Sequence, residues 1–151
     1  MLWDVGAGSG AVGIEWLRAA AGAAAFAIES DPARWEDIKS NADNLGVPDL
    51  LLIKGSAPAA FATIPSPPDA VFVGGGLSQP GLLETCLGHL KPGGRLVANA
   101  VTLESQEILT RLYREHGGEL TRVAVSRSGP VGDMTALRPL MDVLQWAVVK
   151  P

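Results

Sequence analysis

Cysteine is almost absent from the 151 residues of this chain, since Cys86 is its one cysteine. A single thiol excludes an intramolecular disulfide framework and is typical of a reducing compartment such as the cytoplasm. The segment around Cys86 has the apolar periodicity of a helix, which predicts a buried, inert thiol rather than a nucleophile. A chain of 151 residues can bury a core without disulfide or metal support, and it predicts one domain over 1–151.

Basic residues are too few for a general nucleic-acid binder, because 12 Lys and Arg against 16 Asp and Glu leave a net charge of −4. Long apolar runs are also missing. The longest, Ala19 to Ile28, is far shorter than the roughly 20 residues of a membrane-spanning helix. The two histidines, His89 and His116, are widely separated, which predicts no metal site. These features predict a soluble, cytoplasmic protein that binds neither nucleic acid nor a membrane.

Apolar runs alternate with helical patterns along most of the chain. Strands are expected at 2–5, 24–29, 50–54, 69–73 and 95–101, and helices at 10–21, 32–45, 79–90 and 104–116. Two further strands, 119–126 and 143–149, are separated by a loop without a crossover helix, which predicts an antiparallel pair. Strands that are linked through helices form right-handed crossovers and a parallel sheet. The pattern therefore predicts an α/β fold with a seven-stranded, mostly parallel sheet and an antiparallel C-terminal hairpin.

The first expected strand runs directly into a glycine-rich loop, Asp4-Val5-Gly6-Ala7-Gly8-Ser9-Gly10, and then into a helix. Glycines let a loop turn tightly and leave no Cβ between the backbone and a nucleotide. Glu29 ends the next strand, where a carboxylate can accept two hydrogen bonds from a ribose diol. This combination predicts a nucleotide site formed by Gly6, Ala7, Gly8, Ser9, Gly10 and Glu29.

Two glycine patterns overlap in this loop. Residues 8–13 satisfy the dinucleotide pattern G-x-G-x-x-G, which favours an NAD-binding oxidoreductase module. Residues 4–10 satisfy D-x-G-x-G-x-G, the form found in S-adenosylmethionine-dependent methyltransferases. The second pattern begins at the end of the strand and gives Asp4 and Gly6 a role, so S-adenosylmethionine is the favoured cofactor. The terminal strand pair also resembles the class I methyltransferase (Rossmann-like) fold, in which Ser56 and Ala57 would contact the adenine.

Several segments are similar to one family, the decarboxylating precorrin methyltransferases of cobalamin (vitamin B12) biosynthesis. The similarity is carried by residues 2–16, 27–32, 55–58, 73–76, 99–105 and 137–140. The glycine loop alone would identify only the fold. Two segments are more specific to this family, namely the run from Gly74 to Gly76 and the sequence Asn-Ala-Val-Thr-Leu-Glu-Ser at 99–105. The resemblance implies methyl transfer to C15 of a precorrin-6B-type tetrapyrrole, with decarboxylation of the acetate on C12.

The same resemblance implies how the domain is built and assembled. The family has helices ahead of its first strand, so residues 1–151 are expected to be one methyltransferase domain without those helices. Such a domain is either a stand-alone protein or the C-terminal part of a fusion that also methylates C5. The resemblance further implies a homo-oligomer, with a tetramer as the expected state, and places Gly74 beside the S-adenosylmethionine and its product S-adenosylhomocysteine.

An anionic tetrapyrrole requires local positive charge on a net acidic protein. Arg127 and Arg138, in the loop between the last two strands, are the candidates for its carboxylates, because arginine binds carboxylates in a bidentate manner. Decarboxylation needs orientation and a proton source, which Glu104 or Asp133 can supply. Glu104 is therefore a candidate catalytic residue, and Asn99 and Arg138 are two further candidates. A methyltransferase acting on another small molecule and a non-catalytic half of a fusion stay open as alternatives.

Overall fold

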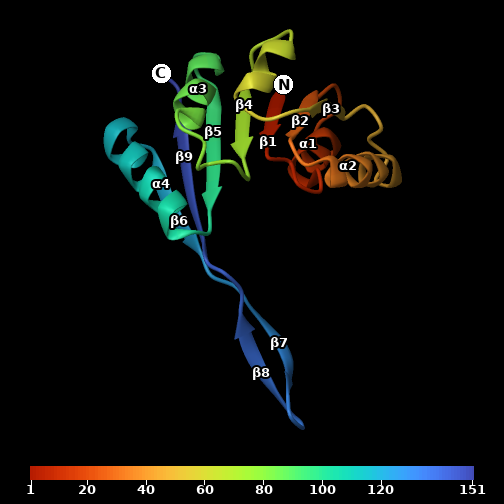
Figure 1. Cartoon of the computed structure of the whole chain (residues 1–151), viewed down its shortest axis with the longest axis vertical. Coiled ribbons are helices and arrows are strands. Elements are labelled where there is room, and N and C mark those ends of the chain that lie inside the picture. Colours follow the sequence, from red (N-terminus) through yellow and green to blue (C-terminus); the bar gives the residue numbers. More distant parts are fainter.

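A computed structural model describes all 151 residues of the chain. It contains a large sheet, four α-helices, one short 3-10 helix and a separate strand pair (Figure 1). In chain order the elements are β1 (Leu2–Val5), α1 (Ala11–Ala19), β2 (Ala25–Glu29), α2 (Pro32–Asn44), β3 (Leu51–Lys54), η1 (Ala59–Thr63), β4 (Ala70–Val73), α3 (Leu82–His89), β5 (Arg95–Ala100), α4 (Leu103–His116), β6 (Glu119–Val123), β7 (Ser126–Val131), β8 (Met134–Pro139) and β9 (Val143–Val149).

The main sheet has seven strands in the order β3-β2-β1-β4-β5-β9-β6. Strands β1 to β5 pair with one another in parallel, and β9 runs antiparallel to both β5 and β6. This confirms the predicted α/β class, the seven strands and the antiparallel C-terminal end. The strand order reverses between β1 and β4, and in such sheets ligands bind at the carboxyl ends of the strands beside that point.

Helices cover the sheet from both sides, and β1 shows why. Its residues alternate, so that Trp3 and Val5 join a core cluster of 21 buried residues that also includes side chains of η1, α3 and α4. Leu2 joins a second cluster of 8 residues, which is formed with Ile14 of α1 and Ile38 of α2. Both faces of β1 are therefore buried, as expected for the central strand of a parallel sheet.

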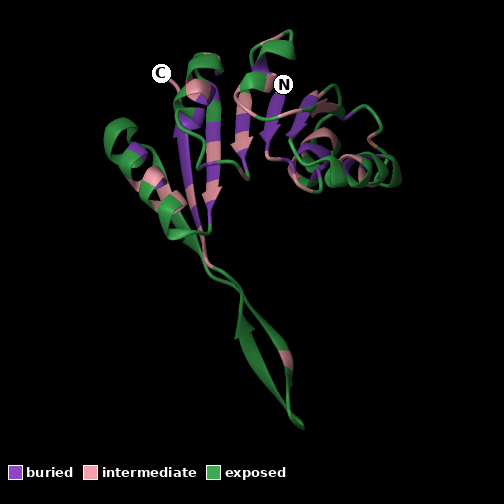
Figure 2. Ribbon diagram, viewed as in Figure 1, coloured by how far each residue is buried: buried purple, intermediate pink, exposed green.

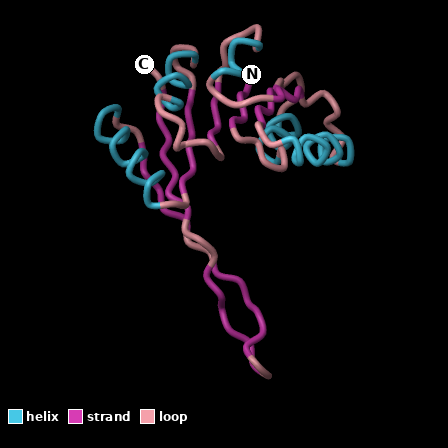
Figure 3. The backbone as a smooth tube through the Cα atoms, viewed as in Figure 1, coloured by secondary structure: helices cyan, strands magenta, loops and turns pink.

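Strands β7 and β8 form a hairpin that projects away from the main sheet (Figure 1). Nearly all of its residues are exposed (Figure 2), and two loop segments connect it to β6 and β9 (Figure 3). The prediction of a loop between the last two strands was therefore wrong over this segment. Because both faces of the hairpin are exposed, no alternation of buried and exposed side chains marks its strands. The turn is made at Gly132, whose φ of +58° suits a two-residue hairpin loop.

Two smaller predictions concern the helices. Cys86 lies on α3 and is a free, fully buried thiol, which confirms the prediction of a buried cysteine. Burial raises the pKa of this thiol to about 12, so it is protonated at neutral pH. None of the helices combines the length and the apolar character that a membrane crossing requires.

Candidate functional site

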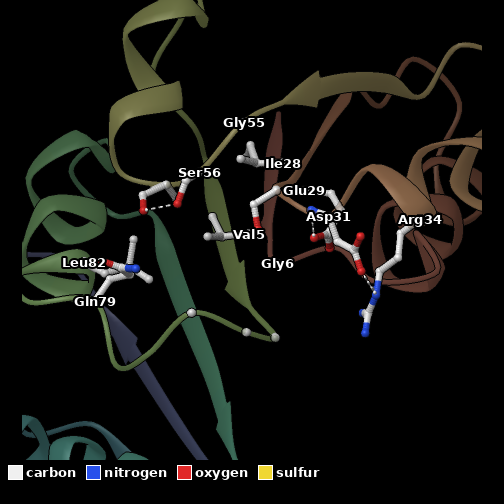
Figure 4. Close-up of a pocket in the computed structure, with 15 residues that line it drawn as sticks. Val5, Gly6, Ile28, Glu29, Asp31, Arg34, Gly55, Ser56, Gln79 and Leu82 are labelled. Atoms are coloured by element: carbon white, nitrogen blue, oxygen red, sulfur yellow. Dashed lines mark hydrogen bonds and ion pairs between the residues drawn. The ribbon is translucent and has the colours of Figure 1, made fainter.

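A cavity of about 410 Å³ lies at the carboxyl ends of β1, β2 and β4, where the strand order reverses. In Figure 4, Ser56, Gln79 and Leu82 lie on one side of this cavity and Asp31 and Arg34 lie on the other. The 15 residues that line it are Val5, Gly6, Ile28, Glu29, Ser30, Asp31, Arg34, Gly55, Ser56, Ala57, Gly74, Gly75, Gly76, Gln79 and Leu82.

The floor of the cavity is backbone, because two glycine segments cross there without side chains. Gly6 has a φ of +67°, and a Cβ added to it would lie 2.7 Å from the amide nitrogen of Gly75. A Cβ at that distance would overlap the backbone, so only glycine lets the loops after β1 and β4 approach so closely. The amide of Gly74 donates to the carbonyl of Val5 at 2.9 Å, which joins the two loops directly.

Glu29 is buried at the end of β2 with 6% of its surface exposed, and it holds both neighbouring loops. Its Oε2 accepts a hydrogen bond from the amide of Gly8 at 2.8 Å, and its Oε1 accepts one from the amide of Asp31 at 2.9 Å. A carboxylate offers about four lone-pair sites, so roughly two remain for a ligand in the cavity. The predicted ribose-binding residue therefore lines the cavity and still has free acceptor positions.

Asp4 is the second buried carboxyl of this region, with 1% of its surface exposed. Its Oδ2 accepts a hydrogen bond from the amide of Gly13 at 2.9 Å, which ties β1 to the first turn of α1. Burial raises the pKa of Asp4 to about 6. The Gly13 hydrogen bond opposes this shift, and the charge of Glu29 adds to it.

Gly13, the last glycine of the overlapping dinucleotide pattern at residues 8–13, has a role in packing. A Cβ on Gly13 would lie 2.9 Å from Cδ1 of Leu50, so this glycine serves the packing of α1 against the core. Gly13 does not line the cavity. The pattern D-x-G-x-G-x-G, whose Asp4 and Gly6 both have structural roles here, accounts better for the loop.

Of the predicted cofactor residues, Gly6, Glu29, Ser56, Ala57 and Gly74 line the cavity. Ala7, Gly8, Ser9 and Gly10 do not, although Gly8 reaches it through its hydrogen bond to Glu29. These four residues instead shape the turn into α1, and Gly8 and Gly10 have φ values of +61° and +80°. The hydroxyl of Ser56 is exposed and makes a 3.4 Å hydrogen bond to the carbonyl of Ala57.

Sequence reasoning missed Arg34 and gave Asp31 only a capping role. The capping prediction is confirmed, because Asp31 accepts a hydrogen bond from the amide of Ala33 at 3.0 Å and Pro32 begins α2. Both Asp31 and Arg34 also line the cavity. The available signal was their position, since the first turn of a helix after the acidic end of β2 lies at the ligand-binding edge of the sheet.

The predicted catalytic residues lie outside the lining of the cavity. Asn99 is on β5, where its Oδ1 accepts a 3.0 Å hydrogen bond from Nε2 of Gln145. Glu104 is exposed in the first turn of α4, a favourable place for a carboxylate next to the helix N-terminus. Asp133 is exposed in the turn of the β7–β8 hairpin. Asn99 and Glu104 therefore stay predictions that rest on the sequence alone.

Arg127 and Arg138, the predicted substrate residues, lie directly opposite each other on β7 and β8. Arg138 donates a hydrogen bond to the carbonyl of Pro130. The two histidines lie apart from the cavity: His89 packs on the rings of Trp3 and Phe61, and His116 lies near Trp146. The structure thus brings the two arginines together but separates them from the residues that line the cavity.

Comparison of the sequence with known proteins identifies relatives of this chain. The family model described as a precorrin methyltransferase domain matches residues 1–150. A Sinorhizobium protein named precorrin-6Y C(5,15)-methyltransferase [decarboxylating] is 47% identical over 99% of this chain, and the match covers 36% of that protein. A Pyrobaculum calidifontis protein named "Probable cobalt-precorrin-6B C(15)-methyltransferase (decarboxylating)" is 34% identical, with 97% of this chain and 78% of that protein covered.

A solved structure agrees with these matches. The crystal structure of the C-terminal domain of precorrin-6Y C5,15-methyltransferase from Rhodobacter capsulatus superposes with a TM-score of 0.89 and 43% identity. The alignment covers 99% of this chain and 79% of that domain. The chain therefore spans little more than a third of the longest relative described above, and most of one solved domain.

Proposed function

Because the chain belongs to the precorrin methyltransferase family, we propose that it methylates C15 of a precorrin-6B-type tetrapyrrole, using S-adenosylmethionine, and removes the C12 acetate carboxyl group as CO2. The observation that carries the proposal is the buried carboxylate of Glu29, which faces a cavity floored by glycine backbone. The activity is a proposal for this chain, since it spans only part of its longer relatives.

The residues present fit the proposed cofactor. Glu29 has acceptor positions left for the two ribose hydroxyls, and the close crossing of Gly6 and Gly75 puts bare backbone, without a Cβ, at the floor of the cavity. The apolar side chains of Ala57 and Leu82 line one side of the cavity and suit the flat adenine ring. The hydroxyl of Ser56 can form a hydrogen bond with the edge of that ring. S-adenosylmethionine supplies an electrophilic methyl group on a sulfonium.

The work left to the protein is alignment and exclusion of water, because methyl transfer is an in-line displacement that needs no metal. Glu29 and the two glycine loops form the floor of the site, and the absence of side chains at Gly74 to Gly76 leaves room there for the in-line geometry. Decarboxylation replaces the carboxyl group by a proton on the acetate carbon. We propose Glu104 or Asp133 as the source of that proton, with Asn99 and Arg138 orienting the acetate.

Arg127 and Arg138 are proposed to bind carboxylates of the tetrapyrrole. They face each other across β7 and β8, and two like charges placed directly opposite in a strand pair repel each other. A carboxylate between the two guanidinium groups removes this repulsion and accepts hydrogen bonds from both.

We also propose that the protein is a homo-oligomer, with a tetramer as the expected state, and that the β7–β8 hairpin forms the contact. The chain exposes 8591 Å², whereas a compact monomer of this mass exposes about 7,300 Å², an excess of about 1,300 Å². Standard interfaces bury about 800 Å² per partner, so the excess is large enough for a stable contact. An isolated two-stranded hairpin is marginally stable in water, which favours its pairing with another copy.

The test of the function is a turnover assay with the tetrapyrrole substrate and S-adenosylmethionine, followed by mass spectrometry. The expected product has gained one methyl group and lost CO2. Titration with S-adenosylhomocysteine and, separately, with NADH tests the choice of cofactor, and we expect binding of the first alone. Methylation of other small molecules but not of the tetrapyrrole would overturn the proposed substrate, and binding of NADH alone would overturn the proposed cofactor.

A further inference from the structure

Arg34 is the only cation among the 15 residues that line the cavity. It lies in the first turn of α2, and its side chain reaches back toward the glycine loop. A Cβ built on Gly8 would lie 3.1 Å from Nη1 of Arg34, so the guanidinium group rests against the bare backbone of Gly8. Figure 4 shows Arg34 at the opposite end of the cavity from Gln79 and Leu82.

The guanidinium group of Arg34 is weakly held within the protein. Its one ion pair joins Nε to Oδ2 of Asp31 at 3.6 Å, which is longer than a hydrogen bond, and 55% of the side chain is exposed. Arg111 shows the contrast, since Glu84 and Glu115 both accept hydrogen bonds from it. Arginine carries five N–H donors in a rigid fork, and those of Arg34 make no side-chain hydrogen bond within the protein.

The charges around the cavity explain why a cation matters there. Glu29 and Asp31 both line it, so a substrate that carries many carboxylates approaches two negative charges. Arg127 and Arg138 lie on the hairpin and not in the lining, so they leave this repulsion in place. Arg34 is the side chain that offsets it at the cavity itself.

We infer that Arg34, in the lining of the cavity, binds a carboxylate side chain of the substrate. The inference rests on the proposed function. The side chain of Arg34 is 55% exposed, whereas Glu29, the proposed ribose ligand, is buried, and this exposure favours the large substrate over the cofactor as the ligand of Arg34.

The test compares wild type with Arg34→Ala and Arg34→Lys in the turnover assay. Loss of a charge-assisted, bidentate contact is expected to raise KM for the tetrapyrrole about tenfold or more in Arg34→Ala, with kcat little changed. Arg34→Lys keeps the charge without the fork and should restore KM in part. Added salt should raise KM of wild type more steeply than KM of Arg34→Ala. The matched control is Arg18→Ala, which removes an exposed arginine at the end of α1 that is paired with Glu15.

A separate titration distinguishes the substrate from the cofactor as the ligand of Arg34. We expect Arg34→Ala to bind S-adenosylhomocysteine as tightly as wild type does. If its affinity falls for S-adenosylhomocysteine but not for 5′-methylthioadenosine, which lacks the amino-acid part, Arg34 binds the cofactor and the inference is overturned. An unchanged KM for the tetrapyrrole in Arg34→Ala also overturns it and leaves the proposed function standing. Absence of turnover in wild type overturns the proposed function itself.

Discussion

The amide of Gly8 donates a 2.8 Å hydrogen bond to Oε2 of Glu29, so the glycine loop and the proposed ribose site share one carboxylate. Because Oε1 is bonded to the amide of Asp31, both oxygens must remain acceptors. Glu29→Gln turns one of them into a donor that faces a backbone N–H. We expect the affinity for S-adenosylhomocysteine, measured by calorimetry, to fall about tenfold to a hundredfold.

A thermal melt of Glu29→Gln should also show a lower Tm, since the mismatch exists without ligand. Glu15→Gln is the matched control, because Glu15 is exposed on α1 and pairs only with Arg18. If Glu29→Gln binds S-adenosylhomocysteine as tightly as wild type does, Glu29 does not bind the cofactor.

The close crossing of the loops after β1 and β4 gives a second prediction. Gly6→Ala places a Cβ 2.7 Å from the amide nitrogen of Gly75, whereas a Cβ on Gly22 meets nothing within 4 Å. Both glycines have positive φ values, +67° and +77°, so each alanine carries a conformational cost of about 1–2 kcal/mol. The clash should add about 1–3 kcal/mol in Gly6→Ala alone.

Urea unfolding of Gly6→Ala and Gly22→Ala measures this difference directly. Gly6→Ala should also lose affinity for S-adenosylhomocysteine, and Gly22→Ala should keep it. Equal stability losses in the two variants would show that the backbone crossing does not require glycine.

The strands β1 to β4 were predictable from sequence because each is a short, mostly apolar run that is followed by glycine or ends in an acidic residue. Such runs keep their signal when a strand is buried on both faces, as the strand 2–5 is. The hairpin of β7 and β8 was not predictable in this way, since neither of its faces packs against the protein. The insertion of β9 between β5 and β6 depends on long-range pairing, which no local pattern encodes.

The residues of the candidate site also fall into two groups, those that the sequence revealed and those that it did not. Gly6 and Glu29 belong to a motif of fixed spacing and were found from the sequence. Arg34 was missed because its place beside Gly8 arises only when α2 folds back toward the glycine loop. The positions of Arg127 and Arg138 opposite each other likewise depend on the register of a hairpin that the sequence did not reveal.

The exposed β7–β8 hairpin gives a prediction about the proposed homo-oligomer. Met134 and Leu137 are 76% and 72% exposed, and a contact with another copy through the hairpin would remove their apolar surface from water. The double variant Met134→Asp/Leu137→Asp should shift the protein from oligomer to monomer in light scattering and leave the binding of S-adenosylhomocysteine intact. Leu51→Asp, on the edge strand β3 at the other end of the sheet, is the control that should remain oligomeric. A wild-type monomer contradicts the proposed assembly.

The buried carboxyl of Asp4 predicts how stability depends on pH. Its pKa in the folded protein is about 6, against 3.8 for an unperturbed aspartate, chiefly because the group is buried. Between these two pH values the folded state holds a proton that the unfolded state has lost, so stability falls as the pH rises through this window. Above pH 6 the folded protein bears the full free-energy cost of burying the ionised carboxylate of Asp4. The rise of its pKa from 3.8 to about 6 corresponds to a loss of about 3 kcal/mol in the free energy of unfolding.

Asp4→Asn removes the buried charge and keeps an oxygen that can accept the hydrogen bond from Gly13. Urea unfolding at pH 8 should therefore show the variant to be more stable than wild type by up to about 3 kcal/mol. At pH 4 the gain should largely vanish, because wild-type Asp4 is then protonated when folded. Asp43→Asn, at an exposed position on α2, corrects for the loss of one negative charge. If Asp4→Asn is less stable than wild type by the same amount at both pH values, the carboxyl of Asp4 is neutral when folded across this range, or its second oxygen makes a contact that the amide cannot replace.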